Sequence, residues 1–170
     1  MMITEPYKGQ SGTEVIFEYS DADSFNHLNP EFVRQTYGVC FVGDRIVIGF
    51  GGKKNAWGLI GGTIEQGEKF EETLVREIQE ESNMEVISYL PIGYQRVIDA
   101  RNDTCIYQLR YVCKVKPHGP FTVDPAGGVT EIKLINPRDY KQYFDWGEIG
   151  DHVMARALEL KAQIDLELSS

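Results

Sequence analysis

Residues 61–84 read GGTIEQGEKFEETLVREIQEESNM, and the fold can be predicted from this stretch outward. Seven of its 24 residues are glutamate, and only two basic residues oppose them. Because residues three and four apart share one face of a helix, Glu77, Glu80 and Glu81 project together. No basic residue is spaced to neutralise Glu77 and Glu81. Clustered carboxylates are ligands that Mg²⁺ and Mn²⁺ prefer, so the stretch predicts a site for a hard divalent cation.

The same stretch carries the apolar pattern of a helix. Phe70, Leu74 and Ile78 recur every four residues, which predicts a helix over 70–82 with one buried stripe. Asn83 follows this pattern, and asparagine readily takes the left-handed conformation that ends a helix. A solvated acidic helix without a role is the alternative interpretation, but the fixed spacing and the preceding double glycine favour a catalytic one.

The flanking sequence predicts strands on both sides of this helix. The expected strands are residues 13–19, a hairpin of 37–42 and 45–50, then 57–60, 85–99, 104–115 and 129–135, and a second helix covers 148–166. Strict alternation along 104–115 places Cys105 and Cys113 on an apolar face opposite Arg110, which indicates core thiols. This order of elements predicts an α/β (α+β) fold, with a mixed sheet and helices packed on its faces.

Charge and cysteine usage exclude several classes of function. The formal net charge is −9, so the chain is suited neither to bulk nucleic acid nor to an anionic membrane surface. The three cysteines form no C-x-x-C pair, so neither a zinc site nor a disulfide framework is expected, and a cytoplasmic location fits better. The N-terminus lacks the pattern of a signal peptide, and every apolar run is too short to span a bilayer.

With these residues in view, the stretch resembles the signature motif of the Nudix hydrolases. The matching positions are Gly62, Glu68, Arg76, Glu77, Ile78, Glu80, Glu81 and Met84. Asn83 stands where the family has glycine, a mild change because both residues tolerate positive φ. Ile60 stands where the family commonly has proline, and Lys69 stands where Ser or Thr often caps the helix. The surrounding elements resemble the family's α/β/α sandwich over roughly residues 36–165.

The resemblance implies an enzyme that hydrolyses a nucleoside diphosphate linked to another group, which makes it a pyrophosphatase with Mg²⁺ (or Mn²⁺) as cofactor. This motif is called the Nudix box, and Glu77, Glu80 and Glu81 are its box glutamates. The resemblance implies that these three glutamates bind the metal, that one of them acts as the base, and that a backbone carbonyl of Gly61 or Gly62 is a further ligand. Arg76 is expected to orient a glutamate, and Glu68 to hold the loop or bind metal through water. Glu131 is the expected fourth carboxylate.

Four basic residues are candidates for substrate contacts. Lys53 and Lys54 lie in the loop before Trp57, where they are able to reach phosphate, although two solvated loop lysines explain them as well. Arg96 and Arg101 are candidates for lining the substrate pocket, but two strands and their turn account for them equally. The substrate is expected to be a small nucleotide derivative.

Two other functions remain open: a Nudix-like module that senses a nucleotide without cleaving it, and a diphosphate isomerase of the same fold. The three glutamates disfavour the first, and cysteines placed in strand patterns disfavour the second. Residues 1–35 are predicted to be an N-terminal leader before a hydrolase domain of residues 36–170. Its large apolar side chains must be covered, either by the same domain or by a second copy in a homodimer.

Overall fold

The computed structural model describes residues 2–9 and 11–169 of the 170-residue chain. Its strands are β1 (Met2–Lys8), β2 (Glu14–Asp21), β3 (Val33–Val42), β4 (Arg45–Gly51), β5 (Ala56–Gly58), β6 (Ile60–Thr63), β7 (Met84–Asp99), β8 (Thr104–Pro117) and β9 (Val129–Ile135). Its α-helices are α1 (Phe70–Ser82) and α2 (Gly147–Ser169), and two short 3-10 helices are η1 (Pro30–Phe32) and η2 (Pro137–Gln142). Both predicted helices and all predicted strands are present.

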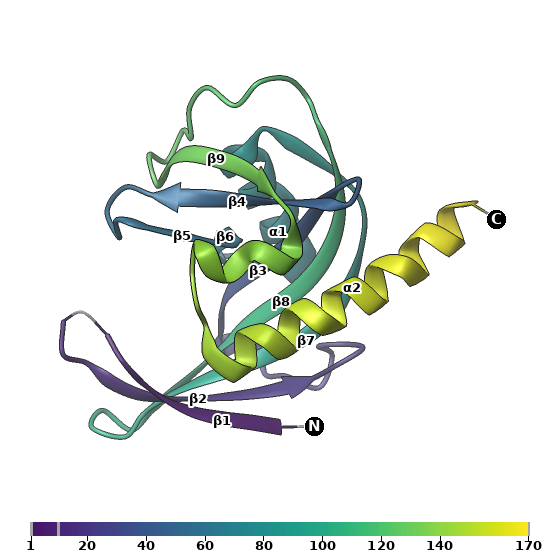
Figure 1. The fold of residues 1–170 in the computed structure, drawn as a ribbon. Coiled ribbons are helices and arrows are strands. Elements are labelled where there is room, and N and C mark those ends of the chain that lie inside the picture. Colours follow the sequence, from purple (N-terminus) through teal and green to yellow (C-terminus); the bar gives the residue numbers. More distant parts are fainter. Residues whose placement is uncertain (1, 10, 170) are drawn as a thin grey trace.

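The strands form one mixed sheet with a helix on each face. The order along the sheet is β1-β2-β7-β8-β3-β4-β5, while β6 pairs with β3 and β9 pairs with β4. The central pair β3 and β8 is parallel, and the other pairs are antiparallel. Figure 1 shows α2 crossing in front of β7 and β8, with α1 behind the strands. The predicted α/β/α sandwich is confirmed, and no helix among residues 2–9 and 11–169 has the length and apolar character that crossing a membrane requires.

Helix α1 forms as its apolar spacing predicts. Leu74 and Ile78 are fully buried in the core between α1 and the sheet. Asn83 ends the helix in the left-handed conformation, with φ 55° and ψ 45°, and its N–H donates to the carbonyl of Gln79 over 3.0 Å. Asn83 therefore ends the helix in the left-handed conformation, at the position where the family motif has glycine.

The leader extends the sheet of its own chain. Strand β2 pairs with β7 from Ile16 opposite Ile98 onward, and β1 pairs with β2 at the outer edge. Tyr19 of β2 and Ile3 of β1 are buried in the core that α2 covers. The carboxylate of Glu5 also accepts hydrogen bonds from the first backbone N–H groups of α2. Strand β1 escapes prediction because it is an edge strand that includes Pro6 and has little alternation.

The cysteines lie on strands, as the sequence predicts. Cys40 and Cys113 are fully buried opposite each other on the parallel strands β3 and β8, whereas Cys105 is half-buried. The proline and glycine near residues 91–93 do not interrupt β7, because a bulge between Pro91 and Gly93 absorbs them. One of the two cores packs α1 on one face of the sheet, and the other packs α2 on the opposite face.

Candidate active site

The carboxylate of Glu81 is held against strand β6. Its Oε1 accepts a hydrogen bond of 2.8 Å from the backbone N–H of Gly61. Gly61 is paired with Tyr37 of β3, and a Cβ at this position would lie 2.6 Å from the Tyr37 Cα. Only glycine fits there, so the double glycine brings the strand close enough for its backbone to meet the helix.

The carboxylate of Glu77 lies against the next glycine. A Cβ at Gly62 would stand 2.5 Å from the carboxyl carbon of Glu77, closer than real Cβ contacts allow. The two glycines therefore form a bare stretch of backbone, and Glu77 and Glu81 lie on it one helical turn apart.

Arg76 connects the remaining carboxylates of the motif. Its Nε and Nη2 donate to the two oxygens of Glu68 over 2.7 and 2.8 Å, which is a bidentate ion pair. Its Nη1 donates to Glu77 over 3.0 Å and to Glu80 over 3.3 Å, and its Nη2 also donates to the carbonyl of Thr63 over 3.1 Å. The hydrogen bonds from Arg76 lower the pKa of Glu68 to about 2, so this carboxylate stays charged.

Glu68 also fixes the loop that leads into α1. Its Oε1 accepts hydrogen bonds from the backbone N–H of Glu65 over 2.8 Å and from the hydroxyl of Thr73 over 3.0 Å. Lys69 stands at the helix start without a capping hydrogen bond from its side chain. The backbone N–H of Lys69 instead donates to Glu72 over 3.4 Å. Glu68 and Glu72 thus stabilise a helix start whose N-cap side chain cannot.

The buried carboxylates have raised pKa values. Burial is the main cause that raises the pKa of Glu81 to about 8, and the charges of Glu77 and Asp124 add to it. Burial also raises the pKa of Glu77, against the influence of Arg76. Carboxylates that are crowded and desolvated to this degree gain from a positive partner, which is typical of functional sites.

Asp124 is a member of this cluster that sequence reasoning missed. It is 4% exposed and lies in the loop before β9, where its carboxylate accepts hydrogen bonds from Ala126 N–H (2.9 Å) and Val129 N–H (2.8 Å). A Cβ on Gly128 would lie 3.3 Å from Asp124 and 3.9 Å from Glu81, so this loop reaches the box helix. The sequence Asp-Pro followed by two glycines indicates a turn, but nothing local indicates where that turn lies.

The structure does not bring Glu131 to the box glutamates. Glu131 is exposed on β9 opposite Phe50 of β4, and the ring of Phe50 packs on Trp57. The next residue, Ile132, packs toward the core beneath α1. Because successive side chains of a strand point to opposite faces, Glu131 lies on the face away from α1. Asp124 occupies the neighbourhood that Glu131 was expected to occupy.

Of the basic candidates, Lys54 lies near the site and two arginines do not. The charge of Lys54 lowers the pKa of Glu81, and its turn is tied to the Asp124 loop by Gly52 N–H donating to the Gly128 carbonyl over 3.2 Å. Lys53 is exposed in the same turn.

Arg96 and Arg101 are engaged elsewhere. Arg96 pairs with Glu18 of the leader over 2.7 Å, and Arg101 pairs with Asp99 at the tip of the β7–β8 hairpin. The first pair links β7 to the leader strand β2 and the second stays within the hairpin tip, so neither arginine contacts the glutamates of the motif.

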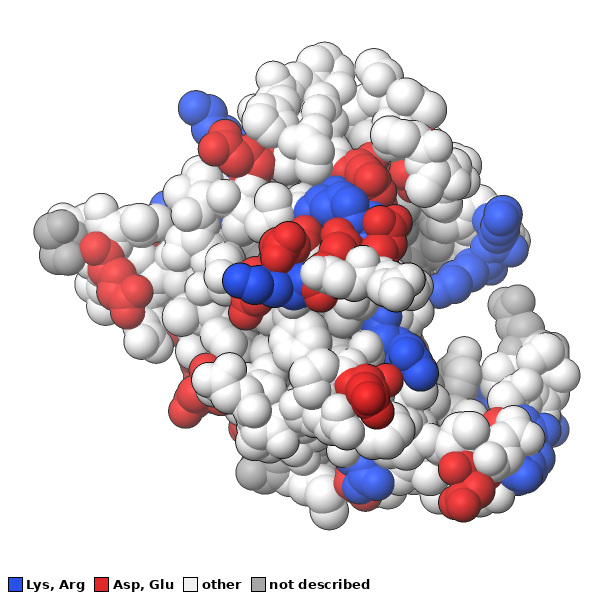
Figure 2. Space-filling model, turned by 180° about the vertical axis from the view of Figure 1, so that it is seen from behind, with Lys and Arg blue, Asp and Glu red and all other residues white. Residues whose placement is uncertain are grey.

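Acidic and basic side chains meet on the face that carries α1. Figure 2 shows this side of the molecule, with acidic side chains gathered around basic ones near its centre. Within the described ranges 2–9 and 11–169, no three His, Cys, Asp or Glu side chains already stand grouped as a metal site. Arg76 bonds to both Glu77 and Glu80, and so it orients these two carboxylates.

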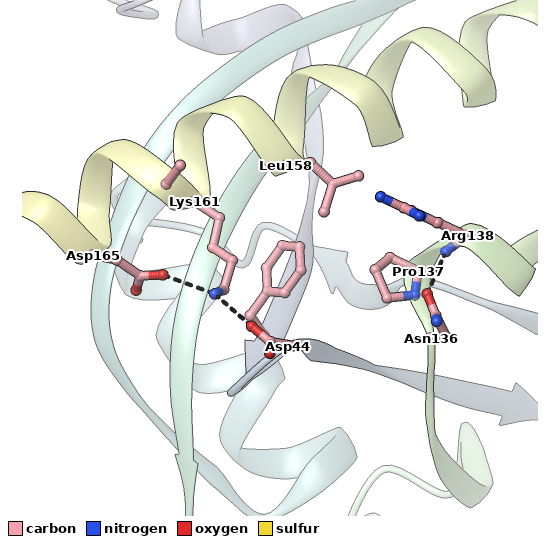
Figure 3. Close-up of a pocket in the computed structure, with 9 residues that line it drawn as sticks. Asp44, Asn136, Pro137, Arg138, Leu158, Lys161 and Asp165 are labelled. Carbon is pink, nitrogen blue, oxygen red and sulfur yellow. Dashed lines mark hydrogen bonds and ion pairs between the residues drawn. The ribbon is translucent and has the colours of Figure 1, made fainter.

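The groove in Figure 3 is a different feature. It encloses about 370 Å³ between the β3–β4 turn, η2 and α2. Its lysine, Lys161, is paired with Asp44 over 3.4 Å and with Asp165 over 2.8 Å. None of the box residues lines it, so it is not the candidate active site.

Comparison with known proteins identifies the family of the chain. Residues 33–157 match the model of the NUDIX domain. The Bacillus subtilis pyrophosphohydrolase BsRppH, in a mutant form, superposes with a TM-score of 0.68 at 14% identity, over 91% of this chain and 96% of that chain. The MutT Nudix hydrolase from Burkholderia pseudomallei gives 0.55 at 17% identity, over 72% and 96%. An ADP-ribose pyrophosphatase from Streptococcus suis gives 0.51 at 16% identity, over 75% and 90%.

At these identities the solved structures show the fold alone, and no curated protein sequence matches the chain significantly. The family model carries more weight because it spans well over half of the chain and includes the whole glutamate motif. The protein therefore belongs to the Nudix family and is a Nudix-type hydrolase.

Proposed function

We propose that the protein is a divalent-metal-dependent pyrophosphohydrolase that cleaves a phosphoanhydride bond in a nucleoside diphosphate linked to a further group. The observation that carries this proposal is the convergence of Glu77 and Glu81 on the bare backbone of Gly61 and Gly62. The named structures support the same chemistry, since one is a pyrophosphohydrolase and another is an ADP-ribose pyrophosphatase.

The residues at this place fit a bound Mg²⁺ or Mn²⁺. The side-chain donors are oxygen-only: Glu77 and Glu81 lie against the backbone of the two glycines, and Glu80 shares the Nη1 of Arg76 with Glu77. Burial and mutual repulsion raise the pKa of Glu77 and Glu81, and a cation would relieve both effects. When bound, the metal would neutralise phosphate charge and lower the pKa of an attacking water.

The chain's own groups have separate tasks in this proposal. Arg76 and Glu68 hold the helix start and orient Glu77 and Glu80. Burial raises the pKa of Glu81 to about 8 in the metal-free protein, and a bound cation would lower it again, so that the ionised carboxylate would be able to accept a proton from water near neutral pH. The charge of Lys54 lowers the pKa of Glu81, so this lysine is near enough to the cluster to meet a phosphate oxygen of the substrate, while the charge of Asp124 adds to the negative charge around Glu81.

A phosphate-release screen tests the proposal. Nucleoside triphosphates, nucleotide sugars and dinucleoside polyphosphates are each incubated with Mg²⁺ or Mn²⁺, and with a chelator as control. We expect turnover of at least one class with metal and none with chelator. Binding without turnover would indicate a nucleotide-sensing module, and rearrangement of a diphosphate without release would indicate an isomerase. Cys40 and Cys113 are buried, so neither is placed to serve such an isomerase.

We also propose that residues 1–35 are a β-hairpin extension of a hydrolase domain of residues 36–170, in a cytoplasmic homodimer. Strand β1 supports the homodimer because it is the last strand of the sheet order and Met2 and Tyr7 on it are exposed. The burial of Tyr19 and Ile3 in their own domain means that the leader does not need a partner to cover its largest side chains.

A further inference from the structure

Arg110 is a buried arginine without an acidic partner. It is 5% exposed on β8, and its guanidinium carbon lies 4.8 Å from the ring centroid of Tyr37 and 5.8 Å from that of Trp146. Its hydrogen bonds go to the side chain of Gln108 over 3.2 Å and to the carbonyl of Leu109 over 3.3 Å. Among the residues that the structure describes, no carboxylate forms an ion pair with it.

Such a side chain is costly for a folded protein. Burial of an unpaired charge costs several kcal/mol, and the surroundings of Arg110 accordingly lower its pKa. Contacts with two aromatic rings offset only part of this cost. An anion from outside the chain would bind favourably to this positive charge, because it would form the ion pair that the chain itself does not supply.

The position of Arg110 relates it directly to the box. In the strand registers, Arg110 of β8 lies opposite Tyr37 of β3, and Tyr37 lies opposite Gly61 of β6, whose N–H holds Glu81. Neighbouring strands are about 4.8 Å apart, so the backbone of Arg110 lies about 10 Å from Gly61 along one straight row across the sheet. Tyr37 and Trp146, the two rings that contact Arg110, pack against the core under α2, so the arginine points to the face of the sheet opposite α1. A substrate that binds the glycines and extends along this face would reach the arginine.

Tyr37 stands between the two charged groups. The charge of Arg110 lowers its pKa and the charges of Glu81 and Glu77 raise it, while burial has the largest effect and raises it. The pKa of the Tyr37 phenol therefore depends on the charge of the arginine and on the charges of the two glutamates. The charges of the arginine and of the two glutamates therefore all lie within electrostatic range of Tyr37.

Neutral amides complete the surroundings of the guanidinium. Gln108 accepts from Arg110 and from Gln95 with the same oxygen, and its Nε2 donates to Gln35 over 2.6 Å. This network fixes the direction of the guanidinium without adding negative charge. Its full positive charge remains for a ligand.

We propose that Arg110 binds a phosphate group of the substrate, next to the phosphoanhydride on which the box glutamates act. The guanidinium lies over the rings of Tyr37 and Trp146, and its N–H groups that do not donate to Gln108 or Leu109 would donate to phosphate oxygens. This inference rests on the proposed function, because it names a binding group for the substrate of that same site.

The test uses inorganic pyrophosphate as the probe, with excess chelator so that no metal contributes. Thermal unfolding with and without pyrophosphate is compared for the wild-type protein, Arg110→Met, Arg110→Lys and the exposed control Arg45→Met. We expect Arg110→Met to be as stable as the wild type or more stable without pyrophosphate, since it removes an unpaired buried charge. It should lose most of the stabilisation by pyrophosphate, Arg110→Lys should keep part of it, and Arg45→Met should behave as the wild type.

A second measurement keeps the proposal decidable if Arg110→Met does not fold. The side-chain Nε–H resonance of Arg110 in the wild-type protein should shift on addition of pyrophosphate and not on addition of adenosine. An Arg110 resonance that ignores pyrophosphate would overturn the proposal, as would a wild-type protein that pyrophosphate does not stabilise. Unchanged stabilisation by pyrophosphate in Arg110→Met would overturn it too, and would leave the arginine a structural role.

Failure of this inference and failure of the proposed function give different results. Turnover of a phosphoanhydride substrate with an unchanged KM in Arg110→Met would reject the arginine's role and retain the hydrolase. Binding of pyrophosphate that depends on Arg110 in a protein that hydrolyses nothing would reject the hydrolase and retain the binding group. If both are correct, Arg110→Met should raise KM by about tenfold or more, because it loses a charged hydrogen bond to substrate.

Discussion

The carboxylate of Glu81 accepts a 2.8 Å hydrogen bond from the backbone N–H of Gly61 while it is buried beside the negative charges of Glu77 and Asp124. The hydrogen bond favours the charged form, but burial outweighs it and raises the pKa of Glu81 to about 8. In the absence of metal, this carboxyl group therefore binds a proton near neutral pH.

The first prediction concerns the stability of the metal-free protein against pH. The pKa of Glu81 rises from its ordinary value of 4.5 to about 8 on folding, so the folded state binds the proton more tightly. Its contribution to the free energy of unfolding is complete below pH 4.5 and is lost as the pH rises through about 8, by at most about 1.4 kcal/mol per pH unit. Denaturant titrations with chelator should show this decline, and Glu81→Gln should flatten it.

Metal addition should reverse the trend. Metal ligands must be deprotonated, so stabilisation by Mg²⁺ should be larger above about pH 8 than near about pH 6. Equal stabilisation by Mg²⁺ at both pH values would contradict the assignment of Glu81 as a ligand.

The second prediction separates the motif from general acidity. Glu81→Gln and Glu77→Gln keep the size of the side chain and remove its charge, so each should lower kcat by about 10²-fold or more. Glu71→Gln is the matched control, since Glu71 lies in the same helix but outside the positions that the motif fixes. The charge of Glu71 raises the pKa of Tyr89 and of Tyr111. Steady-state kinetics on the screened substrate checks this. Similar losses from Glu71→Gln and Glu81→Gln would mean that only bulk negative charge matters.

The third prediction uses the two glycines as a contrasting pair. A Cβ on Gly62 would meet the carboxyl end of Glu77, a flexible side chain that is able to swing away, so Gly62→Ala should cost activity and little stability. We expect a loss in kcat of about tenfold or more, because the carboxylate is displaced. A Cβ on Gly61 would meet the backbone of Thr36 and Tyr37, so Gly61→Ala should cost about 3 kcal/mol of stability or more. Kinetics and denaturant unfolding of both variants, compared side by side, measure the two effects.

The sequence predicts the parts of this site that depend on local spacing. The fixed offsets along α1 place Glu77 and Glu81 on one face, and the apolar stripe of Leu74 and Ile78 decides which face is buried. Asn83 ends the helix for a reason that can be read from its residue type. Helix periodicity and strand alternation likewise predict both helices and the strands from β2 onward.

The parts that escape prediction depend on where the chain returns in space. Asp124 reaches Glu81 because its loop packs over β6, which nothing in the loop sequence indicates. Glu131 points away because a shift in register between β4 and β9 at Phe50 and Gly51 sets the face of that strand. Arg110 looks like one of several polar residues on an exposed strand face, and only the packing of Trp146 over it makes it a buried charge.

The fourth prediction concerns Glu68, which holds the start of α1. Its pKa falls from 4.5 to about 2 on folding, so its stabilising contribution is present above pH 4.5 and is lost as the pH falls through about 2. Glu68→Gln keeps one acceptor for Arg76 but loses the bidentate ion pair, which should cost about 1–3 kcal/mol. Acid unfolding of both proteins should show a smaller loss of stability between pH 4.5 and about 2 in the variant. An identical acid dependence would contradict this role, and Glu65→Gln serves as the control because Glu65 is mostly exposed.

The fifth prediction concerns the leader, which contributes to the fold whether or not it also joins two copies. A chain that begins at Thr36 loses Tyr19, Phe25 and Leu28, all buried, and burial of each such side chain is worth about 1.5–3 kcal/mol. We expect this chain to unfold at much lower denaturant than the full chain. A chain that begins at Thr13 keeps β2 and loses Glu5, which accepts hydrogen bonds at the start of α2, so its loss of stability should be smaller.

Sedimentation equilibrium on the same three chains tests the homodimer separately. If two copies join through the edge of β1, the full chain should be dimeric at micromolar concentration and the chain that begins at Thr13 should be monomeric. A full chain that stays monomeric at high micromolar concentration would refute the dimer, and a Thr13 chain that stays dimeric would place the contact elsewhere. Full stability of the chain that begins at Thr36 would show instead that the leader only rests on the domain. The two measurements together distinguish a strand that completes its own core from a strand that also recruits a second copy.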